Sequence, residues 1–263
     1  MSGTEWRFVD LGCVDCFYGP AAFEAVMDAR AMDMVSDTIL FWRPNKPAVY
    51  VGYHQSVYED IDVDSCRASG VPIIRRTLGG GAGYCDSGQI LYNVIFKEGA
   101  GLPYGPKGVY CLVLGGVIEA LKLLGIDDSC IDENRFSVYA RGKKISGSGQ
   151  LSSRGVVNSG GSFLVDFNYS EMSKYLKDPV KNLRKDVMVP QDGLTCLRRE
   201  IGKIGVEKAG KALRAGFEKV FGPATTGSLT GCELKAAEGL RDKYLSSEWT
   251  FRADMRSDKK KGR

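Results

Sequence analysis

Two short segments combine glycine with cationic side chains, a pattern typical of anion-binding sites. The first segment, Arg75 to Asp86, reads RRTLGGGAGYCD and joins paired arginines to three successive glycines. Glycine lets the backbone approach a ligand closely, successive free N–H groups form a concave anion site, and arginine offers a planar fork for phosphate or carboxylate. The segment is not a P-loop, because no Gly-Lys-Ser/Thr follows, and it does not open a helix as a Rossmann turn does. A tight hairpin without a ligand is the alternative.

The second segment, Gly142 to Gln150, reads GKKISGSGQ and carries two adjacent lysines. Neighbouring side chains of a strand point to opposite faces, so only one lysine can enter a pocket lined by the small residues. We expect Lys144 to do so, because Ile145 would then point into the core. A positive charge there would neutralise charge growing on a phosphoryl or carboxylate oxygen. The alternative is a hairpin turn with two solvated lysines.

Eight cysteines and a single histidine limit the metal chemistry of the chain. Only Cys13 and Cys16 form a CxxC pair, and His54 is the one histidine that could complete a site. A structural zinc site needs four such ligands close together. We therefore expect reduced thiols in a cytoplasmic protein and assign no metal ligands.

The formal charge of +4 belongs to one end of the chain. Six basic and two acidic residues lie from Arg252 to Arg263, so the rest of the chain is neutral. A neutral body argues against nucleic acid, and no apolar run approaches the roughly 20 residues that span a bilayer. We expect a basic, disordered tail at residues 251–263, and neither nucleic acid nor a membrane as a partner.

Hydrophobic periodicity predicts the elements that must position the two segments. A strand at Pro72 to Arg76 leads into the glycines, and Ile90 to Phe96 is the next strand. Apolar residues from Val109 to Leu124 recur at helical spacing, and Gly125 ends that helix. Trp6 to Asp10 is expected as an edge strand. The whole pattern predicts an α+β fold with a mixed, largely antiparallel sheet, packed helices and a helical C-terminal third.

Together these segments resemble the catalytic domain of the lipoate protein ligase family, in the wider group that includes biotin protein ligases and lipoyl or octanoyl transferases. The glycine-rich adenylate loop of biotin protein ligases is absent, which favours the lipoate branch. The resemblance implies one catalytic domain over residues 1–250, without the C-terminal accessory domain that many of these ligases carry. It rests on ordered motifs over most of the chain: Val51 to Gln55, Arg75 to Ala82, Asp86 to Gly88, Leu124 to Ile126, Gly142 to Ser148, Gly161 to Asp166 and Lys243 to Trp249.

The resemblance implies an ATP-dependent ligase that works in two steps. Lipoate attacks the α-phosphate of ATP to give lipoyl-AMP, with Mg²⁺ bridging phosphate oxygens, and a lysine of a lipoyl-carrier domain then displaces AMP. Lys144 matches the catalytic lysine that contacts the carboxyl group and the α-phosphate. The lipoyl chain would need an apolar tunnel, and candidates for its lining are Val51, Tyr53 and Ile74. The implied cofactor-binding residues are Arg75, Arg76, Gly79, Gly80, Gly81, Ala82, Gly83, Tyr84, Cys85, Asp86, Asn134, Lys144, Gly147 and Ser148.

The implied partner is a lipoyl-carrier domain, either a dehydrogenase acyltransferase subunit or a glycine-cleavage H-like protein. A separate accessory subunit is a further possible partner, because the chain ends about a dozen residues after the segment from Lys243 to Trp249. The basic tail would then steer an acidic carrier toward the site.

Departures from the family pattern keep two other functions open. Cys85 stands where the family usually has histidine, and Gly160-Gly161 replaces a later His-Gly pair, so two proton acceptors are lost. One alternative is an ATP-independent octanoyl or lipoyl transferase that uses a cysteine thioester. Its nucleophile would be Cys130, which lies 14 residues before Lys144, or Cys85. The other alternative is a non-catalytic acyl- or carrier-binding relative.

Overall fold

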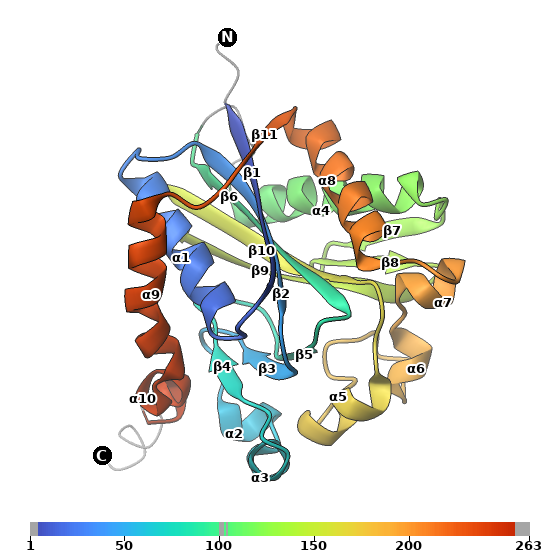
Figure 1. Cartoon of the computed structure of the whole chain (residues 1–263). Helices are drawn as coiled ribbons and strands as arrows, with labels where there is room; N and C mark the ends of the chain where they lie inside the picture. The colour runs from blue at the N-terminus through green and yellow to red at the C-terminus, as the bar shows by residue number, and fades with distance from the viewer. Residues whose placement is uncertain (1–4, 100–102, 104, 256–263) are drawn as a thin grey trace.

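An eight-stranded sheet forms the centre of the molecule (Figure 1). The computed structural model describes residues 5–99, 103 and 105–255. The strands of the large sheet run in the order β11-β1-β2-β6-β10-β9-β8-β7. Their bounds are β1 Trp6–Val14, β2 Asp37–Pro44, β6 Gln89–Lys97, β7 Ser129–Asp132, β8 Ser137–Ala140, β9 Lys143–Ser153, β10 Val156–Leu164 and β11 Ala224–Gly227.

The pairing of these strands confirms the mixed, largely antiparallel α+β fold. β1 pairs in parallel with both β11 and β2, and the pairs from β2 through β6, β10, β9 and β8 to β7 are antiparallel. The prediction of an edge strand at Trp6 was wrong, because Ala224 of β11 pairs with Trp6. β11 lies within the C-terminal third, where the helical periodicity of the residues showed no sign of a short strand. β7 lies at the other end of the large sheet.

A smaller sheet carries the glycine-rich segment. It has the order β4-β3-β5 and consists of β3 Ala48–Val51, β4 Ile73–Arg75 and β5 Gly83–Cys85. The loop between β4 and β5 crosses the large sheet closely, since Gly79 N donates to Gln150 O at 3.0 Å. A Cβ atom at Gly149 would collide with the Gly79 carbonyl oxygen, and one at Gly52 would collide with that of Gly80. Only glycine permits this crossing.

Helices cover both faces of the large sheet (Figure 1). On one face α1 (Tyr18–Ala31) packs against α9 (Gly231–Leu245), and on the other α4 (Pro106–Leu123) packs against α8 (Val206–Phe221). The short helices are α2 Val57–Asp60, α3 Val63–Ala68, α5 Tyr169–Tyr175, α6 Pro190–Gly193, α7 Leu197–Ile201 and α10 Ser247–Thr250. Among the described residues, no helix has the length and hydropathy needed to cross a membrane.

The residues after α10 correct the expected start of the tail. Phe251 packs against the core and lies 5.3 Å from the ring of Tyr58. Asp254 accepts hydrogen bonds from Ser56 Oγ and from Val57 N. Residues 251–255 therefore belong to the folded domain, because they cap a helix of the body. The remaining residues of the expected tail, 256–263, lie outside the described residues.

The crossing of α4 and α8 gives a stability test. A Cβ atom at Gly216 of α8 would lie 2.6 Å from Ala120 N and would also collide with Gly116 O, both backbone atoms of α4. Gly216→Ala should therefore lower the free energy of unfolding by about 1–3 kcal/mol through overpacking. Gly239→Ala on α9 is the matched control, because a Cβ there meets open space. It should raise stability by about 0.5–1 kcal/mol. Equal effects in urea unfolding would contradict the close crossing.

Candidate active site

The two glycine-rich segments enclose one pocket of about 460 Å³. Loop β4–β5, the strands β9 and β10, helix α1 and the segment 178–183 contribute its walls. Most of the residues expected at the site lie there. Those that line the pocket are Arg76, Gly80, Gly81, Ala82, Gly83, Tyr84, Cys85, Asn134, Lys144, Gly147 and Ser148.

Lys144 points into this pocket, and Ile145 is fully buried in the core. The Lys144 ammonium donates to Asn182 O at 3.4 Å. Burial, helped by the nearby Arg135 and opposed by Asp132, lowers the pKa of Lys144 to about 8. Lys144 can therefore exchange a proton near neutral pH. Lys143 instead donates to Gln191 O at 2.9 Å on the surface.

Arg76 holds the glycine loop from inside. Its guanidinium donates to Tyr50 O at 3.2 Å, to Gly79 O at 2.9 Å and to Gly81 O at 2.8 Å. Burial lowers the pKa of Arg76 to about 10. Arg76 lines the pocket, but its N–H groups donate hydrogen bonds to backbone carbonyl oxygens of β3 and of the loop.

Three expected site residues lie outside the pocket. Arg75 is completely buried and donates to the carbonyl oxygens of Gly52, Gln55 and Thr250, each at 2.8 Å. Its guanidinium fixes the end of β3 and helix α10, so a nucleotide could not reach it. Gly79 contributes its backbone to the crossing over Gln150. Asp86 lines a separate cleft.

The apolar part of the pocket comes from residues that the sequence did not single out. Val51 and Ile74, expected in the tunnel, are fully buried in the core, and Tyr53 lies under the guanidinium of Arg252. The pocket is lined instead by Phe23, Trp42, Leu91, Leu164, Met172 and Leu176. These side chains come from separate elements, and no local pattern distinguishes them from other core residues.

The segment 177–189 contains no helix, although the sequence pattern predicts one there, and its residues 178–183 contribute to the pocket wall. It contributes Asp178, Asn182 and Leu183 to the lining. A Cβ atom at Gly81 would lie 2.5 Å from the Asn182 side chain, so the segment lies directly on the glycine loop. An ion pair between Lys181 and Asp60 and a hydrogen bond from Arg135 to Leu183 O hold it in place. Pro179 was the sequence signal against a helix.

The two candidate nucleophiles lie in different surroundings. Cys85 lines the pocket, is 8% exposed, and has its pKa raised to about 12 by burial. Cys130 is exposed on β7, at the end of the large sheet. Cys130 pairs with Tyr139 in a regular ladder, so these two side chains point to the same face. Tyr139 in turn pairs with Lys144, beside a register shift between Val138 and Tyr139. The three residues form a row across β7, β8 and β9, with Cys130 roughly 10 Å from Lys144 along the sheet.

The β7–β8 turn lines the same pocket as Lys144. Asn134 lines the pocket, and its backbone N–H donates to Asp132 Oδ1 at 2.9 Å. Arg135 donates to Asp132 at 3.2 Å, within the same turn. The described residues contain no cluster of three His, Cys, Asp or Glu side chains that could hold a metal ion.

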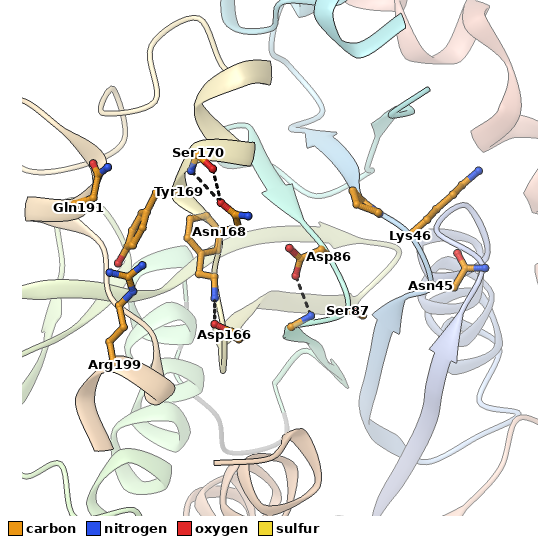
Figure 2. Close-up of a pocket in the computed structure, with 13 residues that line it drawn as sticks. Asn45, Lys46, Asp86, Ser87, Asp166, Asn168, Tyr169, Ser170, Gln191 and Arg199 are labelled. Atoms are coloured by element: carbon orange, nitrogen blue, oxygen red, sulfur yellow. Dashed lines mark hydrogen bonds between the residues drawn. The ribbon is translucent and has the colours of Figure 1, made fainter. Parts of the chain in front are cut away.

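A second, more open cleft of about 760 Å³ lies beside the pocket (Figure 2). Figure 2 shows Lys46 on one side of it, Arg199 and Tyr169 on the other, and Asp86 and Asp166 between them. Burial raises the pKa of Asp86, with a further contribution from Asp166. Most of the dashed bonds of Figure 2 satisfy backbone N–H groups of loops, as in Asp86 accepting from Gly88 N at 2.8 Å. The carboxylates of Asp86 and Asp166 and the amide of Asn168 therefore stabilise turns in this cleft.

Comparison with known proteins decides the family. Residues 15–218 match the family described as the lipoyl protein ligase A/B catalytic domain. The chain belongs to this family. The resemblance seen in the sequence is thereby confirmed, and the chain belongs among the acyl-transferring enzymes of the group. The solved structure of a lipoate-protein ligase A bound with ATP superposes with a TM-score of 0.83 at 21% identity, covering 95% of this chain and 99% of that chain. That likeness shows a shared fold.

Curated relatives correct the expected reaction. The octanoyltransferase LipM of Geobacillus kaustophilus is 29% identical over 96% of this chain and 100% of the relative. That of Kyrpidia tusciae is 28% identical over 94% of this chain and 98% of the relative. Both are named as transferases, so the expectation of an ATP-dependent lipoate ligase was wrong. The motifs that suggested it belong to the fold shared by ligases and transferases.

The pKa of Lys144 provides a direct test of the pocket's electrostatics. Reductive methylation with isotope-labelled methyl groups gives each lysine an NMR signal whose position titrates. The Lys144 signal, assigned by its loss in Lys144→Arg, should titrate with a midpoint of about 8 because burial disfavours the ammonium. A midpoint near the ordinary lysine value of about 10.4 would contradict the buried setting.

Proposed function

We propose that this protein transfers an octanoyl group from a carrier thioester to a lysine of a lipoyl-carrier domain, through a thioester on Cys130. The observation that carries the proposal is the row of Cys130, Tyr139 and Lys144 across β7, β8 and β9. Similarity to octanoyltransferases over nearly the whole chain supports the same reaction.

The surroundings of the two cysteines favour Cys130 as the nucleophile. The thiolate is the attacking form, and burial that raises the pKa of Cys85 to about 12 keeps that thiol protonated at neutral pH. Cys130 is exposed on β7, an edge strand of the large sheet, where two successive protein partners can approach it. Cys85 is enclosed by the pocket walls and has no such access.

The proposed reaction has two balanced steps. In the first, Cys130 Sγ forms a bond to the octanoyl carbonyl carbon, the bond to the donor sulfur breaks, and the donor leaves as a thiol with the proton from Cys130. In the second, the acceptor lysine nitrogen bonds to the same carbon, the bond to Sγ breaks, and Cys130 recovers a proton from the amine. A thioester is already activated, so neither step consumes ATP.

Pocket residues support this chemistry on the acyl side. Phe23, Trp42 and Leu91 offer an apolar surface for the octanoyl chain. Lys144, whose pKa is lowered to about 8, adds a titratable cation to the wall of the same pocket, at the other end of the row from Cys130.

Mass spectrometry of the acylated protein tests the proposal. Incubation with an octanoyl carrier thioester, without acceptor or ATP, should add one octanoyl group that hydroxylamine removes and that peptide mapping assigns to Cys130. Cys130→Ser should abolish both the adduct and octanoyl transfer. Cys232→Ser is the matched control, because Cys232 is also exposed but lies on helix α9, whereas Cys130 lies on strand β7. An adduct on Cys85, or undiminished transfer by Cys130→Ser, would overturn the assignment.

A further inference from the structure

Tyr139 stands between the proposed nucleophile and Lys144, and its hydroxyl has no partner. The side chain is 4% exposed, and its hydroxyl oxygen is buried without a hydrogen bond among the described residues. A buried donor that pairs with nothing is costly, so such groups call for a functional explanation. Tyr139 is a buried core residue that belongs to none of the hydrophobic clusters formed by the described part of the chain.

We propose that the Tyr139 hydroxyl donates a hydrogen bond to the carbonyl oxygen of the acyl group carried by Cys130. The inference rests on the proposed thioester at Cys130 and adds a residue that acts on it. No role in substrate binding or catalysis follows for Tyr139 from the glycine-rich segments or from the family match.

The register of the sheet brings the two groups together. Tyr139 of β8 is the cross-strand neighbour of Cys130 of β7, so their side chains rise from the same face with Cβ atoms about 5 Å apart. A tyrosine hydroxyl stands several bonds further from the sheet than a cysteine sulfur. A carbonyl group attached to Sγ extends further from the sheet than the thiol does, which brings its oxygen toward the hydroxyl. The free thiol does not satisfy this donor, which has no hydrogen-bond partner among the described residues.

The charges around Tyr139 keep it a donor. Burial and the Asp132 carboxylate raise its pKa, while Arg135 and Arg184 act in the opposite direction. The phenol therefore holds its proton at neutral pH. During both proposed steps the acyl oxygen gains negative charge and then loses it as the tetrahedral intermediate collapses. Tyr139 strengthens one hydrogen bond during that interval and keeps its proton throughout, as a preorganised donor does.

Tyr139→Phe removes only the hydroxyl and tests the proposal. The variant should still form the octanoyl thioester on Cys130, with an unchanged KM for the donor. Its kcat should fall on the order of 10²-fold, the usual loss for one oxyanion donor. Isotope-edited infrared spectra of the acylated protein should show the thioester carbonyl band at higher frequency than in the wild type, because a hydrogen bond to that oxygen is gone.

Tyr175→Phe is the matched control. Tyr175 is similarly buried, at 3% exposure, but its hydroxyl bonds to Glu171 on the surface helix α5. Its kcat and carbonyl band should match the wild type. A Tyr139→Phe variant with wild-type kcat and an unmoved carbonyl band would overturn the role of Tyr139 while leaving the thioester intact. A wild-type protein without any adduct on Cys130 would instead remove the proposed function, and this inference with it.

Discussion

The passage of the glycine loop across strand β9 is the contact on which the site depends. Gly79 and Gly149 meet backbone to backbone, and Gly52 and Gly80 do the same, at separations that exclude any side chain. Arg76 then ties the loop to β3 from inside the pocket. This crossing closes the space between the two sheets into a pocket, and it fixes the wall opposite Lys144.

The alternation of side chains along β9 and its neighbouring strands determines which functional side chains face the pocket and which face the core. It directs Ile145 to the core and Lys144 to the pocket, and the pairing with β8 and β7 extends the row from Lys144 outward to Cys130. One sheet therefore supplies both a wall of the enclosed pocket and an accessible thiol on its edge strand. This arrangement suits a reaction in which two carrier proteins must deliver and collect one small acyl group.

Residue type and strand alternation were enough to predict those parts of the site that depend on local backbone geometry. The glycine loop and Lys144 follow from backbone freedom and strand alternation. The same alternation separates Arg75, which is buried away from the pocket, from Arg76, which lines it, since adjacent residues at a strand end face opposite ways. Trp42 and the segment 177–189 could not be predicted, because they reach the pocket through contacts distant in sequence. The sequence motifs also could not distinguish a ligase from a transferase, because the glycine loop and the lysine belong to the fold that both kinds of enzyme share.

The most direct test of the account is octanoyl transfer to a lipoyl domain with ATP enzymatically removed. The account predicts that the octanoyl carrier thioester alone supports transfer, and that octanoate with ATP and Mg²⁺ does not. Transfer that requires free octanoate and ATP, with the carrier thioester inert, would contradict it.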